Sequence, residues 1–153
     1  MDHILREFKE ADAGKVRELI LGILSKEYPF DKSAYSDSDL EKIAQTYGGA
    51  KDVFFVLEEG SNIAGTIAVK TETPDSALIR RFFVDVKRRR HGYGSELLEK
   101  AIAFCKAKGY KKVYFRCTDR MSDAVKLCMK KGFKETETLS VSGFNIHKLE
   151  LGL

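Results

Sequence analysis

The stretch Phe82–Ser95 constrains the fold more than any other, because it passes from a strand pattern to a helix pattern through a basic, glycine-containing loop. The loop carries consecutive Lys and Arg residues up to His91, followed by Gly92 and Gly94. Glycines let the backbone turn so that several N–H groups converge, and the N-terminus of the following helix adds partial positive charge. We therefore expect an anion site here, most readily for phosphate.

Two common phosphate motifs do not fit this loop. In the dinucleotide-binding fingerprint a third glycine would stand where this chain has Leu97, and the chain contains no Gly-Lys-Ser/Thr of a P-loop. The loop therefore predicts a phosphate ligand of another kind.

Hydrophobic periodicity places the loop within an α+β fold. Runs rich in β-branched and aromatic residues predict strands, and turn residues between the three central runs predict an antiparallel meander. Apolar residues at i, i+3 and i+4 predict helices. The predicted strands span residues 4–8, 53–58, 63–71, 76–86, 113–117, 133–137 and 144–151, and the predicted helices begin near Asp12, Asp37 or Asp39, Gly94 and Met121.

The composition favours one domain over residues 1–153, with 43% apolar and 33% charged residues. The acidic start and the lack of a long apolar run predict a cytoplasmic protein without a membrane segment. Cys105, Cys117 and Cys128 form no CxxC pair, so neither a disulfide framework nor a metal site is expected. A net charge of +4 suits an anionic ligand but does not require nucleic acid.

The loop resembles the acyl-CoA motif of the GNAT superfamily, in which Arg or Gln is followed after two residues by Gly and after one more by Gly or Ala. Arg89, Gly92 and Gly94 stand at this spacing, and the similarity extends over roughly residues 53 to 138. It implies a mixed, largely antiparallel central sheet of about seven strands with about four helices on both faces. It also implies an enzyme that transfers an acetyl group from acetyl-CoA to a primary amine by direct attack in a ternary complex.

The same resemblance implies roles for residues around the loop. Family members hold the CoA pyrophosphate mainly through loop N–H groups, pair the pantetheine arm with the preceding strand end, and polarise the thioester carbonyl with a backbone N–H. The implied oxyanion donor lies in the region of Val84. The implied cofactor-binding residues are Phe82, Phe83, Val84, Arg89, Arg90, His91, Gly92, Tyr93, Gly94 and Ser95.

Two positions depart from the family pattern. Leu78 stands where many members carry a general-base Glu, and Cys128 stands where many carry a Tyr that protonates the thiolate. Cys128 could serve as the general acid, since an unperturbed thiol has a pKa of about 8.5, or could be a buried core residue. The general base is open among Asp85, Asp119, Glu72, His147 and water.

The acceptor and the partners are open as well. The acceptor is a small molecule or a protein amino group, and the protein is expected to be a monomer or homodimer. A non-catalytic acyl-CoA binder is the alternative function, and a nucleic-acid module using Lys87–His91 is a third. The aromatic residues Tyr28, Phe30, Tyr35 and Tyr47 could line an amine pocket or cover the core, and the cations Arg80, Arg81, Lys87 and Arg88 are expected to be solvated surface charges.

Overall fold

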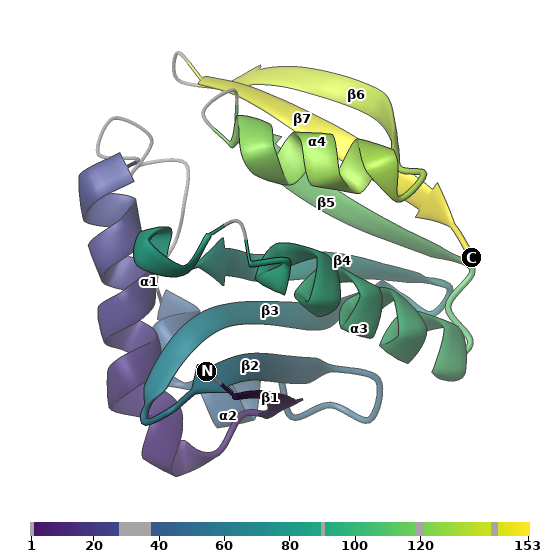
Figure 1. The fold of residues 1–153 in the computed structure, drawn as a ribbon. Helices are drawn as coiled ribbons and strands as arrows, with labels where there is room; N and C mark the ends of the chain where they lie inside the picture. Colours follow the sequence, from purple (N-terminus) through teal and green to yellow (C-terminus); the bar gives the residue numbers. More distant parts are fainter. Residues whose placement is uncertain (1, 28–37, 90, 119–120, 142–143) are drawn as a thin grey trace.

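Seven strands form one mixed sheet in the residues that the computed structural model describes, which are 2–27, 38–89, 91–118, 121–141 and 144–153 (Figure 1). The strands are β1 (His3–Glu7), β2 (Val53–Glu59), β3 (Asn62–Thr73), β4 (Ser76–Val84), β5 (Lys112–Thr118), β6 (Lys134–Val141) and β7 (Phe144–Gly152). They lie in the order β1-β2-β3-β4-β5-β7-β6, and only the β4–β5 pair is parallel among these strands. The predicted α+β class with a largely antiparallel sheet is confirmed.

Helices cover both faces of this sheet. They are α1 (Ala13–Glu27), α2 (Ile43–Thr46), α3 (Tyr93–Ala107) and α4 (Ser122–Lys130), with 3-10 turns at Glu10–Asp12, Ser38–Glu41 and Val86–Arg88. Because side chains alternate along a strand, Phe55 and Leu57 of β2 pack in the cluster that contains α3, whereas Phe54 and Val56 pack in the cluster that contains α1. None of the helices in the described ranges combines the length and apolar character needed to cross a bilayer.

Local hydrogen bonds set two boundaries one or two residues away from their predicted positions. Asp12 does not begin α1 directly, because it ends a 3-10 turn in which its carboxylate accepts from the Lys9 N–H at 2.8 Å. β4 ends at Val84 rather than at residue 86, because the Asp85 side chain accepts from the N–H of Lys87 and begins the next 3-10 turn.

The parallel strands β4 and β5 pair over a short stretch and then separate. Their register runs from Ser76↔Lys112 to Ile79↔Phe115, although both strands continue further. Figure 1 shows the two strands diverging beyond this point, with the starts of α3 and α4 at the open end. Such an opening exposes backbone N–H and C=O groups that a ligand can pair with. We call it the fork.

Candidate functional site

The loop that enters α3 depends on a glycine in the left-handed conformation. Gly92 has φ +80° at the N-cap of α3, a conformation that other residues adopt only with strain. The first bond of the helix runs from the N–H of Glu96 to the carbonyl of Gly92 at 3.1 Å. Helical geometry leaves the preceding N–H groups, from Gly92 to Ser95, without partners inside the helix. These donors and the helix dipole make the loop a site for an anion.

Gly94 lets the start of α3 lie close to the strand end. A Cβ at this position would lie 3.2 Å from the side chain of Leu127 and 3.9 Å from those of Phe82 and Val84. The loop and the end of β4 are therefore in direct contact, as a ligand that spans both would require.

A hydrogen-bonded network that involves the end of β2 supports the loop. Tyr93 is only 5% exposed, and its hydroxyl donates to the carboxylate of Glu59 at the end of β2. Arg88 donates to Glu59 at 2.8 Å and to Asp85 at 2.6 Å. The hydrogen bonds from Tyr93 and Arg88 hold the pKa of Glu59 below its usual range. Arg88 is therefore a structural residue of the loop rather than a solvated charge, which corrects the expectation from sequence.

The other predicted loop residues occupy different environments. Arg89 donates through Nε to the carbonyl of Val84 at 3.1 Å, so its side chain contacts the strand end. His91 is exposed, with its ring 5.5 Å from that of Tyr93. Ser95 is half-buried in the first turn of α3, and Arg90 lies outside the described residues.

A β-bulge at Arg81 interrupts β4 at the beginning of the fork. Arg81 has φ +52°, and the register with β3 shifts between Thr66 and Ala68. The hydroxyl of Thr66 donates to the carbonyl of Arg81 at 2.7 Å, which closes the irregular turn. A bulge re-aims the residues that follow it, and here these are Phe82, Phe83 and Val84.

The side chain of Arg81 is buried in an ion pair, contrary to the expected surface charge. It is 7% exposed, and its Nε donates to Oδ2 of Asp39 at 2.9 Å. The Tyr47 hydroxyl donates to the same oxygen at 2.6 Å. Burial raises the pKa of Asp39, but the hydrogen bonds from Arg81 and Tyr47 outweigh it, so the pKa lies below its ordinary value. Tyr47 is thus a buried core residue, whereas Tyr28, Phe30 and Tyr35 lie outside the described residues.

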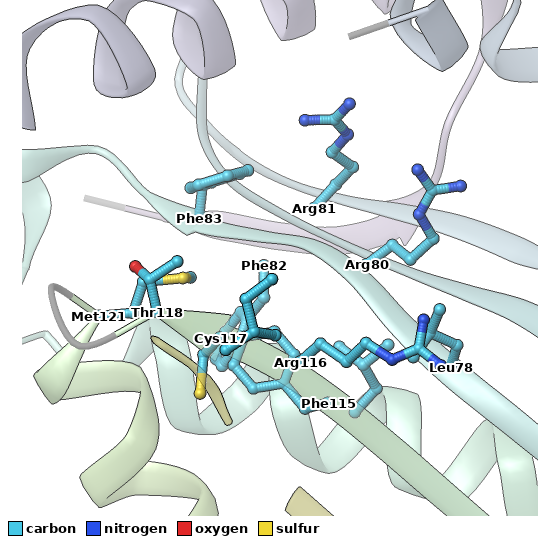
Figure 2. Close-up of a pocket in the computed structure, with 12 residues that line it drawn as sticks. Leu78, Arg80, Arg81, Phe82, Phe83, Phe115, Arg116, Cys117, Thr118 and Met121 are labelled. Atoms are coloured by element: carbon cyan, nitrogen blue, oxygen red, sulfur yellow. The ribbon is translucent and has the colours of Figure 1, made fainter. Parts of the chain in front are cut away.

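A pocket of about 300 Å³ lies at the fork (Figure 2). Its walls come from β4, β5, the residues before α4, and Ile146 of β7. Phe82 and Phe83, two of the residues predicted to meet the cofactor, form part of the wall. The pocket therefore joins the bulge and the separated strands, and Phe82 in its wall lies beside Gly94 of the glycine loop.

The backbone of Val84 faces this fork. The N–H of Asp85 donates to the carbonyl of Ala64 on β3 at 2.8 Å. Adjacent residues of a strand direct their N–H groups to opposite sides, so the N–H of Val84 points away from β3 and toward the side of β5. This is the direction that a donor to a ligand in the fork requires.

A profile of the acetyltransferase (GNAT) family matches residues 17–133, which include the bulged strand, the fork and the glycine loop. The chain belongs to this family. It is an acetyl-CoA-dependent acetyltransferase, and the resemblance found in the sequence is confirmed. No curated protein matches the chain.

Solved structures share the fold of this acetyltransferase along nearly the whole chain. A GNAT-family acetyltransferase from Staphylococcus aureus superposes with a TM-score of 0.86 at 22% identity, covering 99% of both chains. Ard1 from Thermoplasma volcanium gives 0.83 at 22% identity and covers 100% of this chain and 99% of its own. YncA from Salmonella typhimurium, solved with its cofactor acetyl-CoA, gives 0.79 at 16% identity and covers 98% of this chain and 93% of its own.

Two residues of the acetyltransferase sit where proton transfer is expected in the family. Leu78 lines the pocket, and the residues that form its described wall include no Asp or Glu. Cys128 is fully buried in the core cluster of α3 and does not belong to that wall. Burial raises the pKa of the Cys128 thiol to about 12. These surroundings favour packing for Cys128, and its role as general acid stays a prediction.

The candidate bases lie at different distances from the fork. The Glu72 carboxylate pairs with Arg116, a pocket residue, at 2.9 Å. Asp85 is engaged by Arg88, and the Nδ1 of His147 contacts Glu135 on β6. Asp119 lies outside the described residues. Glu72 is therefore the one of these candidate carboxylates that the described structure pairs with a residue of the pocket wall.

Proposed function

We propose that this acetyltransferase transfers the acetyl group of acetyl-CoA to a primary amine by direct attack, with both substrates bound at the fork. The observation that carries the proposal is the pocket between the separated ends of β4 and β5, adjacent to the glycine loop of α3. Acetyl-CoA supplies an activated thioester, and the chain has to position it, expose it to the amine and handle the protons.

The glycine loop suits the pyrophosphate of the co-substrate. The N–H groups from Gly92 to Ser95, which have no partner inside the helix, would donate to it, and the cationic side chains of Arg89 and Arg90 would add attraction. The network of Tyr93, Glu59 and Arg88 holds these donors in place before the ligand arrives, which lowers the ordering cost of binding.

The end of β4 suits the pantetheine arm and the thioester. An amide-containing arm can pair with a free strand edge as a further strand would. The N–H of Val84 points into the fork, where it would donate to the thioester carbonyl and stabilise the charge that develops on its oxygen. Phe82 and Phe83 would cover the apolar part of the arm.

Proton removal from the amine is the step for which the pocket wall offers no carboxylate. With Leu78 in the wall, the proton would leave through water, and Glu72, which pairs with Arg116 of the wall, is the candidate carboxylate that could receive it. The rate should then rise with pH until the bound amine is neutral.

The proposal is tested by product formation. Purified protein with acetyl-CoA should release free thiol only when an accepted amine is present, and mass spectrometry should find the amine 42 Da heavier, as replacing a proton with an acetyl group requires. If acetyl-CoA binds and a broad panel of amines gives no acetylated product, the chain is the non-catalytic acyl-CoA binder that Leu78 and buried Cys128 would allow.

The proposal also covers the localisation, the oligomeric state and the acceptor. We expect a cytoplasmic protein that works as a monomer or homodimer, with a small molecule or a protein amino group as acceptor. Light scattering coupled to gel filtration measures the oligomeric state.

A further inference from the structure

We propose that the acceptor amine carries an anionic group, a carboxylate or a phosphate, within a few bonds of its nitrogen. This inference rests on the proposed function, because it assigns the substrate class of the same pocket. It starts from the charges of the wall, whose described residues include the three arginines Arg80, Arg81 and Arg116 and no acid.

Two of these cations stand on the same face of the sheet. Leu78 of β4 is in register with Tyr114 of β5, and side chains two residues apart on a strand share a face. Arg80 and Arg116 therefore lie on the face of Leu78, opposite the core residues Ile79 and Phe115 that pack with α3. Figure 2 shows both arginine side chains extending toward the same side of the view as Leu78. An amine that approaches the fork from the face opposite α3 meets both guanidiniums.

The acids near these arginines do not offset all of their charge. Asp39 is shared, with Arg81 at hydrogen-bonding distance and Arg80 at 3.9 Å. Glu72 offsets Arg116 at 2.9 Å. Lys148 of β7 is in register with Arg116 on one side and with the acidic Glu137 of β6 on the other, so it does not add to the excess. The described residues around the pocket therefore keep an excess of positive charge, centred on Arg80.

This excess discriminates between classes of amine. A polyamine or a lysine side chain brings only positive charge, which the guanidiniums repel. An amine with a nearby carboxylate or phosphate gains a charge-assisted hydrogen bond from Arg80 or Arg116. The same cations lower the pKa of a bound ammonium and so favour the neutral nucleophile in a pocket without a carboxylate base. A volume of about 300 Å³ is at the small end of ligand sites and fits a compact acceptor or the end of a chain.

Free amino acids, amino phosphates and the acidic N-terminal residue of a peptide share this chemistry. The test measures kcat/KM for matched pairs: aspartate against its diamide, phosphoethanolamine against ethanolamine, and a peptide with N-terminal Asp against one with Asn. Binding of each compound to the complex of protein with CoA is measured by calorimetry as well. The pair that shows the largest ratio identifies the source of the anion.

We expect the anionic member of at least one pair to be preferred by about tenfold or more, the value of one charged hydrogen bond. Arg80→Gln should reduce that ratio to about threefold or less through KM, and Arg80→Lys should retain most of it. Lys112→Gln makes the same charge change at the start of the neighbouring strand β5, and it should leave the ratio unchanged.

Three outcomes are informative. Equal use of both members of every pair overturns the inference and leaves the acetyltransferase proposal intact. Preferential binding of the anionic members without acetylation supports the ligand class and overturns the proposed function. Preference for the member without the anionic group overturns the inference whatever Arg80→Gln does.

Discussion

The Nε of Arg81 donates to Oδ2 of Asp39 at 2.9 Å, and this contact ties the bulge of β4 to the segment that precedes α2. Both side chains are nearly inaccessible, at 4% and 5% exposure. The pair therefore fixes the backbone from which Phe82, Phe83 and Val84 enter the fork. It connects the 3-10 turn Ser38–Glu41 to the strand that would hold acetyl-CoA.

Breaking this pair should cost stability. Asp39→Asn leaves the Arg81 guanidinium buried without its counter-charge, and removal of one partner of a buried pair costs about 3–5 kcal/mol. Urea unfolding of the variant should show this loss in the free energy of unfolding. The matched control is Asp75→Asn, which removes a carboxylate 68% exposed and 4.0 Å from Lys111, and should cost below about 1 kcal/mol. Equal effects of the two substitutions would contradict a structural role for the buried pair.

The lowered pKa of Asp39 gives the same pair a pH dependence. A carboxyl whose pKa is lower in the folded than in the unfolded state stabilises the fold above its unfolded pKa, near about 4, and loses that contribution as the pH falls through the folded value. Wild-type stability should therefore fall on acidification below this value. Asp39→Asn should lose less over the same interval, as unfolding curves at neutral and acid pH can show. A parallel acid loss in both proteins would assign the effect to other carboxylates.

The Tyr93 hydroxyl should affect acetyl-CoA binding by the loop as well as the stability of the fold. Tyr93→Phe removes the hydroxyl that donates to Glu59, a hydrogen bond to a charged group worth about 1.5–3 kcal/mol, and frees the base of the loop. We expect weaker acetyl-CoA binding in calorimetry in addition to a lower melting temperature. Tyr110→Phe is the control, because its hydroxyl donates to the Lys51 carbonyl at 2.7 Å. If both variants bind acetyl-CoA like the wild type, Tyr93 is only a packing residue.

Cys128 can be tested against a second cysteine in an equivalent environment. Cys105 and Cys128 are both fully buried, and burial raises the pKa of each to about 12. Packing alone predicts that Cys128→Ala and Cys105→Ala each cost about 1 kcal/mol and change kcat by less than about threefold. A selective fall in kcat for Cys128→Ala by about a hundredfold, with loss of the alkaline limb of the pH profile, would make it the general acid.

Features that depend on neighbouring residues could be predicted from the sequence, whereas features that depend on residues distant along the chain could not. The glycine loop and the start of α3 follow from adjacent residues, because turn glycines and helical periodicity act over a few positions. The bulge at Arg81 depends on its register with β3, which the sequence of β4 alone does not determine. Arg81 has the sequence pattern of a surface charge because its partner, Asp39, is distant along the chain and lies beside it only in the fold.

The position of Glu59 illustrates the same limit. Glu59 follows an apolar strand and precedes Gly60, so its neighbours in the sequence predict an exposed turn residue. Only the fold brings it under Tyr93 and Arg88, where it supports the loop. An acidic residue at the end of a predicted strand is the signal that the sequence offers, and it is too common to stand out.

The glycine loop of α3 should bind the pyrophosphate of acetyl-CoA, and two glycines allow a direct test of this binding. Gly92 and Gly109 have φ of +80° and +81°, and each has open space around an added Cβ. Gly92→Glu and Gly109→Glu therefore impose the same backbone strain and charge at opposite ends of α3. Calorimetric titration of acetyl-CoA should show wild-type affinity for Gly109→Glu and a loss of about a hundredfold for Gly92→Glu, because a carboxylate beside a phosphate costs several kcal/mol. Equal affinity in the two variants would contradict pyrophosphate binding by this loop.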